Sequence, residues 1–272
     1  MKHRVEVVSG QRFEFGENWR RFLSVLDDSR IAIAEESLRA MLGVESLAGR
    51  RLLDAGSGSG LFSLAARRLG AKVHSFDFDP ASVACTAELR RRYFLDDPDW
   101  TIEEGSLLDK AYLESLGLFD VVYSWGVLHH TGQMWEALGN VAVLVGSSGR
   151  LYISIYNDQG GASRRWKALK RLYNKHRFLR IPLCTYTVFR QWTLTLVRDT
   201  LHGRPLASWR NYKASRGMSP WHDVVDWIGG YPFEVAKPEE VLDFLRQRSF
   251  ELARLKTCAG GIGCNEYLFQ RR

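Results

Sequence analysis

Short apolar runs alternate with helix-type patterns along residues 50–156. The spacing predicts strands at 51–54, 72–76, 101–103, 119–123 and 150–156, and helices at 61–69, 80–93 and 133–144. Strands that alternate with helices form right-handed crossovers and therefore a parallel sheet. Further along, a helix at 238–248 precedes two strand-like runs at 250–257 and 265–270, which a glycine-rich turn joins into a hairpin. The pattern thus predicts an α/β fold with a mostly parallel sheet.

The same pattern divides the chain into three parts. Residues 1–47, with a helical pattern from Trp19 to about Leu42, are expected to form an N-terminal helical cap. Residues 48–156 and 233–272 would together form the α/β core. Between them, residues 157–232 are a basic, aromatic-rich insertion with helical patterns at 164–175 and 185–201. Because this insertion follows the fifth strand, we expect it to lie over the carboxyl edge of the sheet as a lid.

Charge is unevenly distributed along the chain. The 272 residues include 38 Lys and Arg against 31 Asp and Glu, a net charge of +7. From Gly160 to His222 there are 14 basic residues and one acid, Asp199, so this segment alone carries +13 and the remainder carries −6. Such asymmetry indicates an anionic partner or surface for the insertion.

Other features of the composition limit the class of protein. No run of 18 apolar residues occurs, so no membrane-spanning helix is expected, and the polar start of the chain favours a cytoplasmic protein. The four cysteines form no CxxC pair and have no histidine at zinc spacing. Reduced thiols are therefore expected, and nothing in the sequence calls for a metal.

A glycine-rich bend, Leu53-Asp54-Ala55-Gly56-Ser57-Gly58-Ser59-Gly60-Leu61, closes the first strand and opens a helix. Glycines let a backbone approach a ligand closely, and the helix N-terminus offers unpaired N–H groups. A dinucleotide fingerprint would read G-x-G-x-x-G, whereas this bend reads D-x-G-x-G-x-G with an acid two residues before the first glycine. A phosphate site would gain little from that carboxylate. We therefore expect Asp54, Gly56, Ser57, Gly58 and Gly60 to contact a different ligand.

The second strand ends in Phe76-Asp77-Phe78-Asp79-Pro80. An acid at this position of a doubly wound sheet can accept hydrogen bonds from both ribose hydroxyls of a nucleotide, and Asp77 is the candidate. Asp79 is instead expected to cap the next helix, with Pro80 in its first turn. Phe78 could pack against the base.

Three later segments complete a recognisable series: Glu104-Gly105-Ser106-Leu107-Leu108-Asp109, Phe119 through Trp125 to His130, and Gly146 to Leu151. Together with the bend, this order and spacing resemble the class I S-adenosylmethionine-dependent methyltransferases. The strand that leads into the histidine pair is most similar to the ubiquinone and menaquinone biosynthesis type. The resemblance implies a Rossmann-like, seven-stranded, mostly parallel sheet with an antiparallel last strand, and S-adenosylmethionine as cofactor.

The resemblance also implies roles for the cofactor residues. The glycine bend would lie against the methionine moiety, with Asp54 near its amino group. Ser106 and Leu107 would border the adenine, and Trp125 would follow the fourth strand beside the cofactor. Trp19, in the aromatic-rich stretch 13–19, would either fold over the cofactor or simply anchor a helix in the core.

Candidates for catalysis follow the fourth and fifth strands, at the sheet edge where open α/β folds bind ligands. His129 and His130 could act as a general base. Methyl transfer often needs only positioning, so both could instead be loop histidines held beside the cofactor. Tyr156 is a candidate substrate contact, although the following Asn157-Asp158 is also a plain turn signal.

The sequence leaves several uses open for the basic insertion. It could bind an anionic small molecule as a lid, contact an anionic membrane that carries a lipid-tailed substrate, or bind RNA, or its charges could simply form a solvated face. RNA is the least favoured, because no RNA-binding module or Asn-Pro-Pro-Tyr-type motif is present. The resulting prediction is methyl transfer from S-adenosylmethionine to a small-molecule acceptor, with oxygen favoured and sulfur or nitrogen open. An RNA methyltransferase and a noncatalytic cofactor-binding protein are the alternatives.

Overall fold

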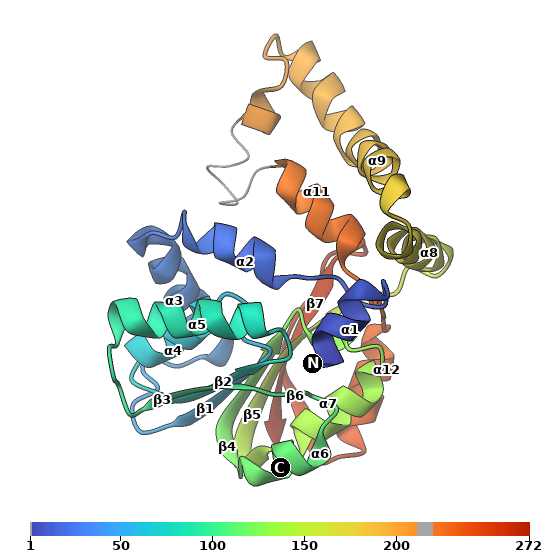
Figure 1. Cartoon of the computed structure of the whole chain (residues 1–272). Coiled ribbons are helices and arrows are strands. Elements are labelled where there is room, and N and C mark those ends of the chain that lie inside the picture. Colours follow the sequence, from blue (N-terminus) through green and yellow to red (C-terminus); the bar gives the residue numbers. More distant parts are fainter. Residues whose placement is uncertain (1, 211–219) are drawn as a thin grey trace.

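The computed structural model describes residues 2–210 and 220–272, and its centre is a seven-stranded sheet of order β3-β2-β1-β4-β5-β7-β6 (Figure 1). Strands β1 to β5 pair in parallel, whereas β7 is antiparallel to both β5 and β6. This topology confirms the expected fold class. The strands are β1 (Arg51–Ala55), β2 (Lys72–Asp77), β3 (Trp100–Glu104), β4 (Phe119–Trp125), β5 (Val145–Tyr156), β6 (Phe250–Lys256) and β7 (Cys264–Arg271).

Helices cover both faces of the sheet, because each face buries its own hydrophobic cluster. One cluster joins the strands to α3 (Asp28–Leu42), α4 (Leu61–Arg68) and α5 (Pro80–Tyr93). The other joins them to α6 (Lys110–Ser115), α7 (Met134–Ala142) and α12 (Pro238–Arg246). The short helix η1 (Leu128–His130) follows β4.

The N-terminal cap differs from the expected single helical pattern. It contains α1 (Lys2–Val8), α2 (Gly16–Leu23) and α3. The break after α2 has a local cause, since the Asp27 side chain accepts a hydrogen bond from the Arg30 backbone N–H and caps α3. Helix α1 was not expected from the sequence. It lies beside the carboxyl edge of the sheet (Figure 1).

The insertion forms helices over the carboxyl edge of the sheet: α8 (Gly161–Lys175), η2 (Arg177–Leu179), α9 (Arg180–Leu201) and α11 (Pro220–Gly229). A small separate cluster packs α8 and α11 together around Trp166 and Ile228. Helix α9 extends away from the sheet (Figure 1). Residues 211–219, including the aromatic Tyr212, lie outside the described part of the chain. Within residues 2–210 and 220–272, no helix has the length and apolar character needed to cross a membrane.

Candidate active site

A cavity of about 440 Å³ lies at the carboxyl ends of β1, β2 and β4. All the predicted cofactor residues except Gly60 line it, namely Trp19, Asp54, Gly56, Ser57, Gly58, Asp77, Phe78, Ser106, Leu107 and Trp125. Among the predicted catalytic residues, His130 lines the cavity, whereas His129 and Tyr156 are not among its lining residues. Segments that are far apart in the sequence therefore meet at one sheet edge.

The glycine bend reaches the cavity through backbone conformations that favour glycine. Gly56, Gly58 and Gly60 have φ angles of +93°, +54° and +80°. A Cβ on Gly56 would lie 2.4 Å from the Val127 side chain, so this glycine lets the loop after β4 approach the bend. A Cβ on Gly60 would instead lie 2.8 Å from the Thr86 Cα, so Gly60 serves the close packing of α4 on α5.

At the end of β2, Asp77 links the glycine bend to the turn that precedes α5. Its carboxylate accepts hydrogen bonds from the backbone N–H groups of Gly58 and Asp79, both at 2.9 Å. Burial raises the pKa of Asp77 to about 6, although these bonds oppose the shift. Each carboxylate oxygen can accept further hydrogen bonds, so the group remains suited to a ligand that carries hydroxyl donors.

Asp54 is more deeply buried, at 2% exposure. Its carboxylate accepts a hydrogen bond from the Ser63 hydroxyl, which also contacts Ser75 at 2.8 Å. Burial raises the pKa of Asp54 to about 7, and the nearby charge of Asp77 adds to the shift. Among the described residues, no basic side chain forms an ion pair with either carboxylate. The cavity thus contains two acids, buried Asp54 and half-buried Asp77, that have no ion-pair partner among the described residues.

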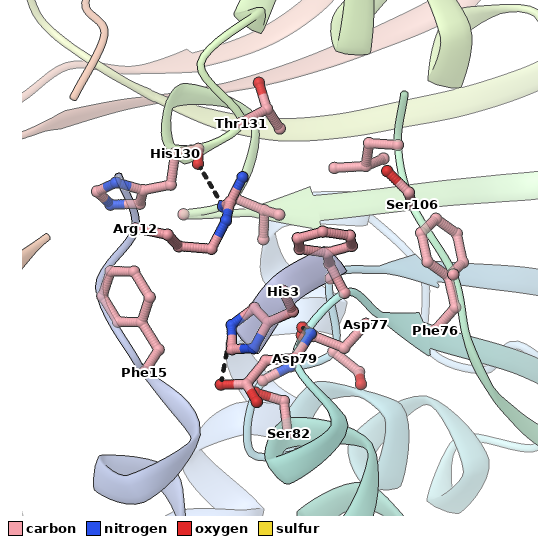
Figure 2. Close-up of a pocket in the computed structure, with 18 of the residues that line it drawn as sticks. His3, Arg12, Phe15, Phe76, Asp77, Asp79, Ser82, Ser106, His130 and Thr131 are labelled. Atoms are coloured by element: carbon pink, nitrogen blue, oxygen red, sulfur yellow. Dashed lines mark hydrogen bonds and ion pairs between the residues drawn. The ribbon is translucent and has the colours of Figure 1, made fainter. Parts of the chain in front are cut away.

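The N-terminal segment contributes part of the cavity lining, as Figure 2 shows for His3, Arg12 and Phe15. Asp79 caps α5 as expected, and it also accepts a hydrogen bond from the Gly16 backbone N–H at 2.8 Å and pairs with His3 at 3.7 Å. The Arg12 guanidinium lies 4.9 Å from the Phe78 ring centre. One carboxylate therefore organises both the helix and its cover.

His130 forms the opposite wall of the cavity. Its Nδ1 lies 2.6 Å from the Pro232 carbonyl oxygen, so Nδ1 carries the hydrogen and donates, which leaves Nε2 as the acceptor of the neutral ring. Its backbone oxygen accepts a hydrogen bond from Arg12 at 2.8 Å. Burial lowers the pKa of His130 to about 3, so the imidazole is neutral at physiological pH.

His129 and Tyr156 lie behind this wall. The His129 ring is 1% exposed and its centre is 4.1 Å from that of Tyr156. The backbone N–H of Tyr156 donates to His129 Nδ1 at 3.4 Å. Burial lowers the pKa of His129 well below its usual value and raises that of Tyr156, so both are neutral. They pack against the loop that carries His130.

Several residues of the site were not expected from the sequence. His3 and Arg12 line the cavity from a terminus that has no recognisable motif, although Arg12 immediately precedes the aromatic stretch 13–19. Lys170 does not line the cavity but is fully buried on α8 in the insertion, with its amine 4.1 Å from the Trp227 ring centre. Burial lowers the pKa of Lys170 to about 7. Lys170 lies among the exposed basic residues Lys167 and Arg171, so nothing in the sequence distinguishes it as the buried one.

Comparison with known proteins identifies the family. A family model described as a methyltransferase domain matches residues 26–194. The ubiquinone biosynthesis O-methyltransferase of Nitrosococcus oceani is 30% identical over 173 residues, which cover 59% of this chain and 70% of that protein. The tRNA U34 carboxymethyltransferase of Methylococcus capsulatus is 31% identical over 122 residues, 44% of this chain and 36% of that protein. The chain therefore spans only about a third of this second relative.

Solved structures agree on the fold. The magnesium protoporphyrin IX methyltransferase of Synechocystis, crystallised with bound SAH (S-adenosylhomocysteine), superposes with a TM-score of 0.55 at 17% identity over 94% of both chains. An O-methyltransferase family protein of Burkholderia thailandensis gives a TM-score of 0.53 at 16% identity, over 98% of this chain and 66% of that one. With the family match over more than half of its length, the chain belongs to the methyltransferase-domain family and is a class I S-adenosylmethionine-dependent methyltransferase.

Proposed function

We propose that this protein methylates a small-molecule acceptor, with oxygen as the favoured acceptor atom, in the cavity at the end of β1, β2 and β4. The observation that carries the proposal is the pair of carboxylates that line the cavity, buried Asp54 and half-buried Asp77, which form no ion pair with a basic side chain of the described residues. A buried acid is costly unless it is paired. A ligand with a positive charge and hydroxyl donors would satisfy both groups.

S-adenosylmethionine fits these residues. Asp54 would face the ammonium of its amino-acid end, and Asp77 would accept hydrogen bonds from the ribose hydroxyls. Phe78, Ser106 and Leu107 border the part of the cavity beyond Asp77, where the adenine would lie. Trp19 covers Gly58, since a Cβ on this glycine would lie 3.2 Å from the indole. Tryptophan and glycine together would shape the cover over the methionine moiety.

The cofactor supplies an electrophilic methyl group attached to a positively charged sulfur. The residues of the chain exclude water and orient the acceptor, which can provide much of the rate. His130 is neutral and has Nε2 available as an acceptor, so it would orient the hydroxyl of the substrate. Its low pKa makes it a weak base, which favours positioning over full proton abstraction. His129 and Tyr156 would hold His130 in place.

Calorimetry with S-adenosylhomocysteine tests the cofactor site. Asp77→Ala is expected to weaken binding by about 1–3 kcal/mol, from the loss of charge-assisted hydrogen bonds. Asp109→Ala is the matched control, because Asp109 caps α6 and is not among the residues that line the cavity. Unchanged affinity of Asp77→Ala would reassign the ribose contact, and a wild-type protein that binds neither S-adenosylmethionine nor its product would overturn the proposal.

Turnover separates the remaining alternatives. Release of S-adenosylhomocysteine in the presence of candidate hydroxyl, thiol or amine acceptors is expected to occur with the hydroxyl compounds. Cofactor binding without any release would identify a noncatalytic binding protein. Tight, steeply salt-dependent binding of RNA would favour the nucleic-acid reading instead.

We further propose that α9 contacts an anionic membrane surface, which suits a lipid-tailed acceptor. Large apolar side chains on η2 and α9 are exposed to an unusual degree: Phe178 at 76%, Ile181 at 75%, Phe189 at 70%, Leu194 at 81% and Leu201 at 81%. Apolar groups exposed along a protruding helix indicate an interaction surface.

The charges around these side chains favour lipid over a second copy of the chain. Arg190 and Arg198 are exposed on α9, and Arg177 is exposed on η2. The acid of this segment, Asp199, is 8% exposed, and its carboxylate accepts hydrogen bonds from Ser208. Two copies would therefore place arginine against arginine, whereas anionic headgroups attract each basic residue by about 1 kcal/mol.

Sedimentation with phosphatidylcholine vesicles, with and without phosphatidylglycerol, tests the membrane contact. Binding is expected only with the anionic lipid, and Leu194→Ser is expected to weaken it several-fold. Leu95→Ser, at a residue 70% exposed in the turn after α5, is the control and should bind as the wild type does. Equal binding by all variants, or concentration-dependent dimers that Leu194→Ser abolishes without lipid, would contradict the proposal.

A further inference from the structure

The hydroxyl of Tyr123 is a buried polar group whose role is unexplained by the fold. Tyr123 lies on β4 and is 4% exposed, yet its hydroxyl finds no hydrogen-bond partner among the described residues. The residue also lines the cavity. Leaving a buried hydroxyl unsatisfied costs free energy, so such a group at a ligand cavity calls for a partner.

The position of Tyr123 in the sheet places it beside Asp54. The two residues are register partners on the parallel strands β1 and β4, so their side chains emerge on the same face. The ring is held by Phe62, stacked at 5.0 Å between ring centres, and by Tyr152, edge-on at 5.1 Å. Burial raises the pKa of Tyr123 well above its usual value, and the nearby Tyr152, Asp54 and Glu266 add to the shift in that order. The hydroxyl is therefore always protonated and can donate.

The glycine bend has few donors left for an anionic group. The backbone N–H groups of Gly56 and Ser57 both donate to the Phe76 carbonyl oxygen, at 2.9 and 3.1 Å. The Gly58 N–H donates to Asp77 at 2.9 Å, and the Gly60 N–H to the Ser57 oxygen at 2.8 Å. A carboxylate that lies against this bend therefore finds few backbone donors there, and a further donor from a neighbouring strand would complete its hydrogen bonding.

We propose that Tyr123 binds the cofactor by donating a hydrogen bond from its hydroxyl to the carboxylate of the amino-acid end, while Asp54 faces the ammonium. Asp54 on β1 and Tyr123 on β4 would thus bind the ammonium and the carboxylate of the cofactor's amino-acid end, respectively. This inference rests on the proposed cofactor site. It assigns a binding role to Tyr123, a residue of the fourth segment for which the resemblance implied none.

Two ligands and one substitution test the inference. S-adenosylhomocysteine carries the amino-acid end, whereas 5′-methylthioadenosine retains the adenine, the ribose and the sulfur but lacks it. Tyr123→Phe is expected to raise the Kd for S-adenosylhomocysteine about tenfold, as for a hydrogen bond to a charged group, and to leave the Kd for 5′-methylthioadenosine unchanged. Tyr152→Phe is the matched control, because its hydroxyl donates to Glu266 and the residue is absent from the cavity lining. It should leave both affinities unchanged.

The stability of the ligand-free protein gives a second readout. Because the Tyr123 hydroxyl has no partner in the folded chain, Tyr123→Phe should melt at or above the wild-type temperature. Equal loss of both ligands, or no loss of either, would overturn the inference. A wild-type protein that binds 5′-methylthioadenosine and S-adenosylhomocysteine equally would overturn it too, whereas failure to bind either compound would overturn the cofactor site itself.

Discussion

The two walls of the cavity both carry titratable side chains that are largely shielded from water, but the walls differ in how these side chains are hydrogen-bonded or paired. On the wall formed by β1 and β2, burial raises the pKa of Asp54 to about 7 and that of Asp77 to about 6. On the wall formed by the loop after β4, burial lowers the pKa of His130 to about 3. The same loss of water penalises the charged form in both cases.

The difference lies in the partners. The His130 ring already donates to a backbone carbonyl and remains neutral, so it needs no ligand to balance a charge. The carboxylates of Asp54 and Asp77 form no ion pair with the described residues, so a ligand would have to supply the balancing positive charge. One wall therefore suits a cationic, hydroxyl-bearing cofactor, and the other suits a neutral acceptor.

The largest expected change in the free energy of unfolding occurs at low pH and comes from His130, on the wall formed by the loop after β4 (the histidine wall). The folded-state pKa of His130 lies below the unfolded value of 6.5, so the unfolded chain takes up the proton first and stability falls as the pH drops from 6.5 toward 3. The complete shift corresponds to at most about 5 kcal/mol. Urea unfolding across this range should give a shallower pH dependence for His130→Gln, whose amide can still donate to Pro232. Identical slopes would show that His130 titrates normally.

A slightly smaller change in the free energy of unfolding, with the opposite dependence on pH, is expected from Asp54, on the wall formed by β1 and β2 (the carboxylate wall). The folded-state pKa of Asp54 is raised, so its ionisation costs stability increasingly as the pH rises from 3.8 to about 7. Asp54→Asn should therefore stabilise the ligand-free protein by up to about 4 kcal/mol at mildly alkaline pH, and hardly at all near pH 4. The same variant should bind S-adenosylhomocysteine more weakly. Stabilisation without loss of affinity would remove Asp54 from the cofactor site.

The contact between the two walls offers the smallest effect. Gly56 lies against Val127, where an added Cβ would come within 2.4 Å of the valine side chain. Gly56→Ala should cost about 1–3 kcal/mol of stability through strain and overpacking, and should weaken cofactor binding. Gly126→Ala is the control, because its φ is +76° but no atom lies within 4 Å of the added Cβ. Equal losses in the two variants would show that backbone strain alone is responsible.

Much of the carboxylate wall could be predicted from the sequence, because its residues belong to one strand, bend and helix unit. The roles of Asp77 and Asp79 were distinguished by their places relative to Pro80, and the structure confirms Asp79 as the helix cap. The histidine wall was less predictable. His129 and His130 are adjacent in sequence, and only the packing of Tyr156 and Pro232 decides that His130 alone of the pair lines the cavity.

The sequence by itself determined where the strands lie along the chain, the glycine bend and the acids near the ends of β1 and β2, because local patterns and turn chemistry specify these features. Only the tertiary structure decided that Arg12 covers Phe78, that Lys170 is buried and that the Tyr123 hydroxyl has no partner. These properties depend on contacts between residues distant in the chain. Burial, which decides the charge of a group, arises only when such segments pack together.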